Sequence, residues 1–233
     1  MRVGVVTFPG SNCDCDTVEA FEFLDVPTKH LWYADTDLTD VDAVVLPGGF
    51  SYGDYLRSGA LAAKAPMMTA IRDAIQGRDL PVLGICNGFQ ILTEAGLLPG
   101  ALRANRHGQF RCAWQTLRVT NESPLFLGLS EGELLRLPIA HAEGSYYAPA
   151  GTLADLFMSR EVWLQYVDDR GDLNTLTNPN GSLANIAGIT RGNVAALMPH
   201  PERALEKAFG SEDGRRLLMA WLRCLQERST HAS

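Results

Sequence analysis

The feature that most constrains the fold is an alternation of short apolar runs with helical patterns along the first hundred residues. Residues 3–8, 28–33, 43–46 and 81–85 are apolar or β-branched and are bounded by Gly, Pro or Asp, as strands are. Residues 14–24 and 67–76 carry apolar side chains at helical spacing, and Pro66 suits a helix start. Because parallel strands need such crossovers, we predict an α/β fold: an open, mostly parallel sheet with helices on both faces.

The second half of the chain follows a different pattern. Residues 112–120, 133–139 and 162–167 are strand-like with no long helix between them, which predicts an antiparallel extension of the sheet. Residues 194–198 return to a strand, and residues 215–226 form an amphipathic closing helix. No linker composition divides the 233 residues, so we expect one domain over 1–233.

Composition excludes some classes of binding partner and favours one cellular compartment. The chain has 20 Lys+Arg against 27 Asp+Glu, a net charge of −7, which argues against nucleic acid or a membrane as the main partner. No run approaches the ~18 apolar residues of a membrane span, and the N-terminus is typical of a buried strand rather than a signal peptide. Five cysteines, an odd number, favour reduced thiols and a cytoplasmic protein.

The sharpest motif is an apolar strand that runs through Gly-x-Cys-x-Gly at 84–88 into a helix. This is a nucleophile elbow with cysteine in place of serine: the turn exposes the nucleophile, and the two glycines avoid collisions there. The Cys86 thiol would lie above the first turn of a helix, whose dipole favours the thiolate. The alternative is a small buried cysteine that precedes a helix.

A second motif, His200-Pro201-Glu202, follows another apolar strand. Proline keeps His200 extended at the strand end. Glu202 is then close enough to accept the second N–H of the imidazole, as the third member of a triad does. Taken alone, the motif fits a helix cap equally well; together with the cysteine elbow, it favours a catalytic site.

A third motif, Pro47-Gly48-Gly49, also follows a strand. Two glycines let backbone N–H groups approach a ligand, so this loop could supply one oxyanion donor while the amide of Asn87 supplies another. An ordinary turn or a phosphate loop is the alternative, although the residues that a P-loop or a dinucleotide fingerprint requires are not in this loop.

These motifs resemble the class I (triad) glutamine amidotransferases, through GICNGFQ at 84–90, PGG at 47–49 and HPE at 200–202. A closer resemblance, over nearly the whole chain, is to the glutaminase subunits of phosphoribosylformylglycinamidine synthase. It rests on FPGSNCD at 8–14, residues 48–59, AHAEG at 140–144, residues 198–203, NPNGS at 178–182, and Asn105 with Gly108, Phe110, Cys112 and Trp114. The resemblance implies a flavodoxin-like sheet.

The resemblance also implies roles for individual residues. Cys86 would be the nucleophile, His200 the general base and acid, and Glu202 its orienter. Gly49 and Asn87 would be backbone oxyanion donors. The implied contacts with glutamine come from Gln90, Gly48 and His141, although His141 could instead line a subunit interface.

The implied reaction is hydrolysis of glutamine through a γ-glutamyl thioester on Cys86. The ammonia would pass to a synthetase subunit, which uses ATP and Mg to convert formylglycinamide ribonucleotide to formylglycinamidine ribonucleotide in purine biosynthesis, with a small accessory subunit. No cofactor is implied for this chain itself. The segment 50–57, beside Gly49, is the one expected to transmit docking of the synthetase.

Two other functions remain open from the sequence: a Cys-dependent peptidase or deglycase of similar fold, and a non-catalytic regulatory subunit. We expect no metal site, because nothing at metal-binding spacing completes the pair Cys13 and Cys15. Cys112 and Cys224 lie in apolar patterns and are expected in the core. His30 and His107 have no acid at triad spacing and are expected to play no catalytic part.

Overall fold

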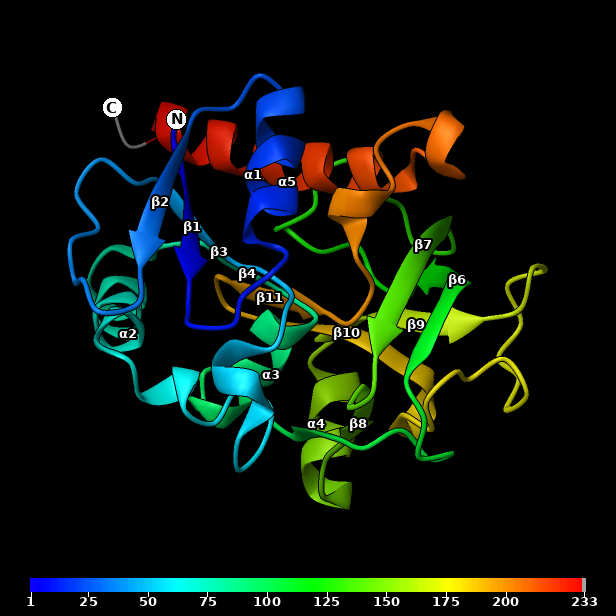
Figure 1. Cartoon of the computed structure of the whole chain (residues 1–233). Helices are drawn as coiled ribbons and strands as arrows, with labels where there is room; N and C mark the ends of the chain where they lie inside the picture. The colour runs from blue at the N-terminus through cyan, green and yellow to red at the C-terminus, as the bar shows by residue number, and fades with distance from the viewer. Residues whose placement is uncertain (232–233) are drawn as a thin grey trace.

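The computed structural model describes residues 1–231, and in them nine strands form one sheet (Figure 1). Five neighbouring strands are parallel: in spatial order, β2 (Thr28–Trp32), β1 (Val3–Thr7), β3 (Ala43–Leu46), β4 (Val82–Ile85) and β11 (Val194–Leu197). The antiparallel strands β10 (Ile186–Arg191), β9 (Val162–Val167), β6 (Arg111–Val119) and β7 (Leu134–His141) continue the sheet. The predicted α/β fold and its antiparallel extension are confirmed.

Helices cover both faces of the parallel half, as predicted (Figure 1). Helices α1 (Asp14–Phe23) and α5 (Asp213–His231) lie together on one face, where the Phe21 and Trp221 rings have centroids 6.1 Å apart. Helices α2 (Pro66–Arg78) and α3 (Asn87–Glu94) lie on the other face. Pro66 begins α2, where its missing N–H costs nothing.

Four elements of the described chain were not predicted. They are helix α4 (Ala150–Met158), strand β10, and the strands β5 (Ala101–Arg103) and β8 (Ser145–Tyr147), which form a separate two-stranded sheet. In β10, Gly188 interrupts the β-branched pattern. The glycine is needed because a Cβ there would come within 2.8 Å of both the Trp163 Nε1 and the Ala196 carbonyl oxygen.

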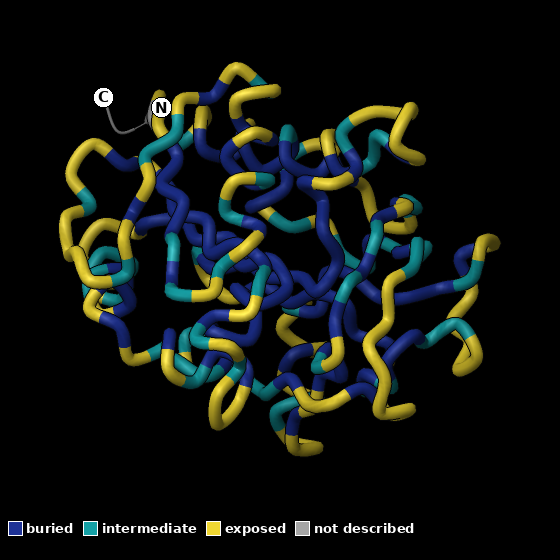
Figure 2. Tube along the Cα trace, viewed as in Figure 1, coloured by how far each residue is buried: buried dark blue, intermediate teal, exposed yellow. Residues whose placement is uncertain are grey.

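The core follows the sheet, and β3, β4 and β11 are buried along their whole length (Figure 2). Cys224 is buried in α5, as expected. The expectation that Cys112 is buried is wrong, since this residue is exposed. Cys112 is exposed because it lies at the beginning of β6. Within β6, only Thr116–Val119 pair with β9, so the first half of the strand extends past the buried centre of the sheet.

The antiparallel half curls back toward the ends of the parallel strands. Strand β7 is four places from β11 in the sheet, yet its Pro138 carbonyl accepts a 2.8 Å hydrogen bond from the His200 amide just beyond β11.

No helix in the described part of the chain is both long and apolar enough to cross a bilayer. The last two residues of the expected domain, 232 and 233, lie outside the described residues.

Candidate active site

Four adjacent parallel strands bring their carboxyl ends to one edge of the sheet. Cys13 follows β1, the glycine loop follows β3, Cys86 follows β4 and His200 follows β11. Ligand sites in open α/β sheets form at this edge, because the loops that leave the strands converge there. Residues up to 190 positions apart in the sequence therefore meet here, as the 3.1 Å hydrogen bond from Arg203 to the Cys13 Sγ shows.

The backbone at Cys86 has the conformation of a nucleophile elbow. Its φ of 50° and ψ of −102° are costly for a residue with a side chain, by about 1–3 kcal/mol, and such strain concentrates at functional sites. A Cβ on Gly88 would collide with the Leu46 carbonyl, and a Cβ on Gly84 would come 2.9 Å from the backbone of Gly88. Both glycines are thus required for α3 to begin directly at Asn87.

His200 and Glu202 form a buried pair. The imidazole Nδ1 lies 2.5 Å from the Glu202 Oε1, and the two side chains are 2% and 0% exposed. Because a carboxylate can only accept, Nδ1 carries the proton. The ring's Nε2 has no hydrogen-bond partner among the described residues, so this nitrogen remains available for proton transfer.

The charges around His200 favour its protonated form. Burial alone lowers the pKa of an imidazole, but the Glu202 carboxylate and the neighbouring Cys86 outweigh burial and raise the pKa of His200 to about 10. The cysteine, the histidine and the glutamate are therefore one electrostatically coupled set. Such a set can take a proton from a thiol and deliver it to a leaving group.

The glycine loop lies against this set. Gly49 has a φ of +136°, which favours glycine, and it pairs with Ser11 in an isolated bridge. A Cβ on Gly48 would come 2.7 Å from the imidazole Cε1 of His200, so only glycine lets the loop approach so closely. Asn87 is the first residue of α3, where an amide has no acceptor within the helix. Asn87 thus follows the elbow directly, and Gly49 lies in the loop that contacts His200 through Gly48.

The predicted glutamine contacts have different surroundings. The Gln90 side chain is 5% exposed, donates to the Glu143 carbonyl at 2.7 Å and accepts from the Asn87 side chain at 2.9 Å. His141 is 2% exposed at the end of β7, next to Ala140, whose carbonyl lies 3.8 Å from the Cys86 Sγ. Gln90 and His141 therefore adjoin the site from inside the protein.

Sequence reasoning did not place Cys13 at this site. Its Sγ lies within 4.8 Å of ligand atoms of both His200 and Glu202, and it receives a 3.1 Å hydrogen bond from Arg203. Burial, helped by the charge of Glu202, raises the pKa of Cys13 to about 12, so it stays a thiol. Cys15 is exposed, so the two cysteines do not act together. Only the order of the parallel strands could have placed Cys13 here.

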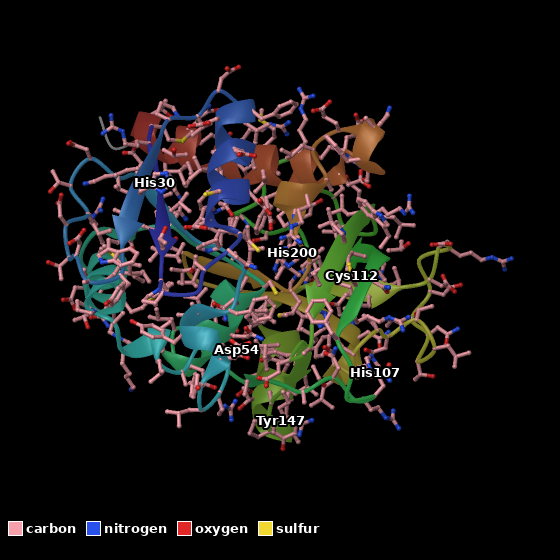
Figure 3. The ribbon with its side chains drawn as sticks, in the orientation of Figure 1. His30, Asp54, His107, Cys112, Tyr147 and His200 are labelled. Carbon is pink, nitrogen blue, oxygen red and sulfur yellow. The ribbon has the colours of Figure 1, made fainter. Side chains whose placement is uncertain are left out.

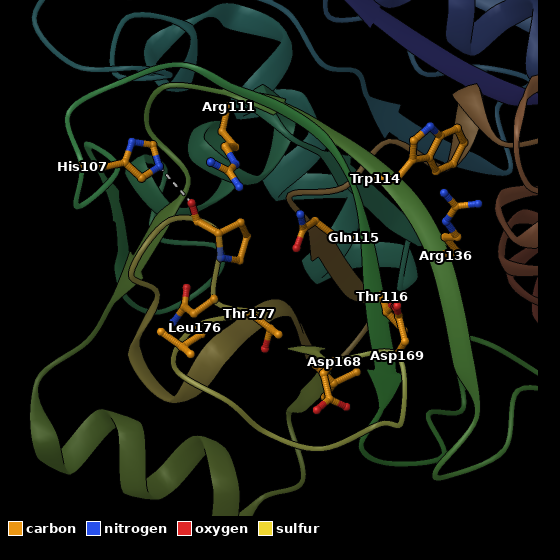
Figure 4. Close-up of a pocket in the computed structure, with 13 residues that line it drawn as sticks. His107, Arg111, Trp114, Gln115, Thr116, Arg136, Asp168, Asp169, Leu176 and Thr177 are labelled. Carbon is orange, nitrogen blue, oxygen red and sulfur yellow. Dashed lines mark hydrogen bonds between the residues drawn. The ribbon is translucent and has the colours of Figure 1, made fainter.

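An open groove lies apart from this constellation (Figure 4). It has a volume of about 780 Å³ and is lined by residues of β6, β7 and the loop after β9, together with His107 from the loop before β6, whose Nε2 lies 3.0 Å from the Pro179 carbonyl. It holds neither Cys86 nor His200. His30 on β2 also lies away from His200 (Figure 3).

Comparison with known proteins gives one family. A model described as a CobB/CobQ-like glutamine amidotransferase domain matches residues 1–226. The chain belongs to this glutamine amidotransferase family. A glutamine amidotransferase from Thermotoga maritima, 19% identical with a TM-score of 0.59 over 98% of this chain and 97% of that one, shares the fold.

Closer relatives carry a single name, phosphoribosylformylglycinamidine synthase subunit PurQ. The Methanosarcina mazei protein is 50% identical over 221 residues, covering 93% of this chain and 95% of that protein. The Chlorobium luteolum protein is 52% identical over 229 residues, covering 97% and 99%. A chain in the structure of PurLQS from Thermotoga maritima is 43% identical, with a TM-score of 0.84 over 96% of this chain and 98% of that one.

Proposed function

We propose that this chain is the glutaminase subunit of phosphoribosylformylglycinamidine synthase. The observation that carries the proposal is the buried pair of His200 and Glu202, 2.5 Å apart, beside a cysteine held in an elbow. The PurQ relatives, which align along nearly the whole chain, support the same function. The ammonia released from glutamine would serve the ATP-dependent conversion of formylglycinamide ribonucleotide to formylglycinamidine ribonucleotide in purine biosynthesis.

In the proposed mechanism the Cys86 thiolate attacks the side-chain amide carbon of glutamine. The amides of Gly49 and Asn87 hold the oxyanion that forms, and preorganised donors of this kind are worth about 10²–10³ in kcat each. His200, protonated and oriented by Glu202, gives its proton to the departing ammonia. A γ-glutamyl thioester remains on Cys86.

In the second step His200, now neutral, takes a proton from water as the water attacks the thioester. Glutamate leaves, and the Cys86 thiolate and the protonated His200 are restored. This chain supplies every group that the two steps need, with no cofactor of its own. ATP and Mg belong to the synthetase subunit, and the proposed complex also includes a small accessory subunit.

The direct test is glutamine hydrolysis by the purified chain mixed with a synthetase subunit, ATP, Mg and formylglycinamide ribonucleotide. We expect glutamate and formylglycinamidine ribonucleotide to form in equal amounts. Hydrolysis of glutamine at the same rate in every mixture would instead indicate a self-sufficient amidase. No hydrolysis in any mixture would indicate a non-catalytic subunit.

The segment 50–57 is the proposed route by which docking of the synthetase reaches the site. The Ser51 amide donates to the Asn87 side chain at 3.3 Å, so this segment is bonded to the residue that follows the nucleophile. Tyr55 and Leu56 are 76% and 84% exposed on the same segment. A partner that contacts these two side chains would therefore act on the placement of the Asn87 amide.

Replacing both side chains, Tyr55→Ser with Leu56→Ser, tests this route. We expect basal glutamine hydrolysis to persist and its stimulation by the synthetase to fall. Leu176→Ser is the matched control, since Leu176 is 90% exposed in the loop between β9 and β10. Full stimulation of the double variant would exclude the segment as the route.

We also propose a cytoplasmic location, where free thiols stay reduced. Five cysteines without a disulfide among the described residues are consistent with it. The same proposal treats residues 1–233 as one glutamine amidotransferase domain. The continuous nine-stranded sheet of the described residues supports this, because elements from both ends of the chain pack in one core.

A further inference from the structure

A buried polar network holds the segment 140–144, which lies against the nucleophile. Its members are His141, Asn105, Asn180 and Ser182, which are 2%, 3%, 0% and 3% exposed. They come from three separate parts of the chain and converge on Gly144. Buried polar groups are costly unless each is paired. Because these four side chains are paired with one another and with this turn, they specify a single conformation for it.

Asn105 uses its whole hydrogen-bonding capacity on this segment and its own loop. Its Nδ2 donates to the His141 carbonyl and the Gln109 carbonyl, both at 2.9 Å. Its Oδ1 accepts from the Gly144 amide at 3.0 Å and lies 3.1 Å from the His141 Nδ1. The two carbonyl acceptors fix which end of the amide is nitrogen, so the His141 Nδ1 must carry a proton.

Asn180 fixes the other side of the imidazole. Its Nδ2 donates to the Gly144 carbonyl at 2.8 Å and lies 3.4 Å from the His141 Nε2. The second N–H of this amide lies between Nε2 and the Tyr166 hydroxyl, which is 3.5 Å from Nδ2, and an unprotonated Nε2 on a neutral ring fits this arrangement. Burial, helped by the charge of His200, correspondingly lowers the pKa of His141 to about 4. The low pKa makes His141 a weak base, and its two ring nitrogens face the amides of Asn105 and Asn180, so His141 is a poor substitute for His200 as general base.

The imidazole also fills the space beside Gly144. A Cβ on Gly144 would come within 2.7 Å of the His141 Nε2, and closer still to the ring's Cε1 and Nδ1. The histidine and the glycine thus form one packed unit. A change in either displaces the other.

The segment that this unit supports contacts the reacting region at two points. The Ala140 carbonyl lies 3.8 Å from the Cys86 Sγ, and the Glu143 carbonyl accepts a 2.7 Å hydrogen bond from Gln90 on the nucleophile's helix. We propose that His141, with Asn105 and Asn180, is a positioning residue that sets segment 140–144 against Cys86 and so holds glutamine for attack. This proposal rests on the glutaminase function proposed above.

An isosteric pair of variants at His141 tests the inference. In His141→Asn the new amide can still donate to Asn105, whereas His141→Leu has the same size and no polar atom. We expect His141→Leu to lower kcat/KM for glutamine about 100-fold, since a displacement of about 1 Å in a reacting group costs that much. His141→Asn should recover at least about tenfold of the loss.

A second readout separates positioning of glutamine from damage to the thiol or the fold. In His141→Leu, a glutamine-analogue electrophile should label Cys86 far more slowly than in the wild type, while iodoacetamide should label it at the wild-type rate. Peptide mass spectrometry identifies the labelled cysteine. Equal slowing with both reagents, or unchanged kcat/KM in a folded His141→Leu protein, would overturn the inference. An inactive wild-type chain would instead overturn the proposed function.

The packing of His141 against Gly144 offers an independent test that does not rely on one variant being folded. Gly144→Ala should lower kcat/KM sharply in the wild-type background and have little further effect in His141→Ala, where the space is open. Gly151→Ala is the control, because a Cβ there has no neighbour within 4 Å. Additive losses from the two changes would contradict the proposed unit.

Discussion

The two halves of the sheet contribute to the site in different ways. In the parallel half, β1, β3, β4 and β11 each deliver a site residue directly at the carboxyl end, so Cys86, His200 and the glycine loop follow from local sequence and strand order. In the antiparallel half, β7 reaches the site only because the sheet curls, as the His200 to Pro138 hydrogen bond shows. The parallel half carries the reacting groups, and the antiparallel half supplies β7, whose end contacts Cys86 and His200.

The largest expected effect comes from removing the nucleophile of the parallel half. Cys86→Ala should abolish glutamine-dependent synthesis, since no other group can form the thioester. Synthesis from added ammonia by the assembled complex should survive. Cys112→Ala is the matched control, because Cys112 is an exposed thiol on β6 and should leave both activities intact. Loss of the ammonia-dependent reaction in Cys86→Ala would point to a defect in assembly.

The members of the triad should differ in their effects. His200→Ala should lower kcat for glutamine by about 10²–10⁴, because the ring moves the proton in both steps. Glu202→Gln should cost less, since it keeps the shape and loses only the charge that orients and stabilises the ring. Steady-state glutaminase assays of the assembled complex compare the two variants. A near-normal rate for His200→Ala would refute the triad, and the neutral, enclosed ring of His141 leaves no obvious substitute.

The elbow glycines should matter for folding as much as for chemistry. Gly88→Ala places a methyl group against the Leu46 carbonyl of β3, and we expect a loss of about 1–3 kcal/mol in unfolding free energy, typical of overpacking. Gly151→Ala on α4 should change it by less than about 0.5 kcal/mol. Urea titrations measure both. Equal values would mean that the elbow tolerates rearrangement.

Stability should also depend on pH through His200. Burial lowers the pKa of this ring, but Glu202 and Cys86 raise it overall, to about 10 against an ordinary value of 6.5. Because the pKa of His200 is higher in the folded protein than in the unfolded chain, protonation of this ring stabilises the fold. This stabilisation is complete below about pH 6.5 and is lost as pH rises toward 10. Glu202→Gln should flatten this fall. The measurement is the unfolding free energy of the wild type and of Glu202→Gln across that pH range. Parallel curves for the two proteins would contradict the electrostatic coupling between Glu202 and His200.

The smallest effect concerns the two cysteines once expected in the core. Cys224→Ala should destabilise the protein by about 1 kcal/mol, as loss of a small buried group does. Cys112→Ala should be nearly neutral, because that side chain is exposed at the end of β6 that extends past β9. Thermal unfolding distinguishes the two. The reverse order would mean that β6 pairs in a different register.

The sequence predicted the parallel half well for a physical reason. A buried parallel strand must be continuously apolar, a tight strand-to-helix turn needs glycine, and proline after His200 fixes an extended backbone. These are local requirements, so the motifs around Cys86 and His200 could be recognised without tertiary information. Strand β10, by contrast, was not predicted. It contains Gly188, which is needed because Trp163, distant in sequence, packs where a Cβ would lie.

The rest of the site depends on long-range contacts. Cys13 and Cys15 are neighbours in sequence, yet only Cys13 is buried beside His200, because α1 begins between them and turns the other thiol to solvent. His141 is a similar case. Its sequence neighbourhood gave no sign that Asn105 and Asn180, 36 and 39 residues away, would enclose the ring.

The most direct test of the account is to locate the adduct of a glutamine-analogue electrophile on the wild-type chain assembled with its synthetase. Peptide mass spectrometry should find a single modified residue, Cys86, with glutamine-dependent synthesis lost and ammonia-dependent synthesis retained. An adduct on Cys13 or Cys15, with Cys86 unmodified, would contradict the assignment of the nucleophile and with it the proposed mechanism.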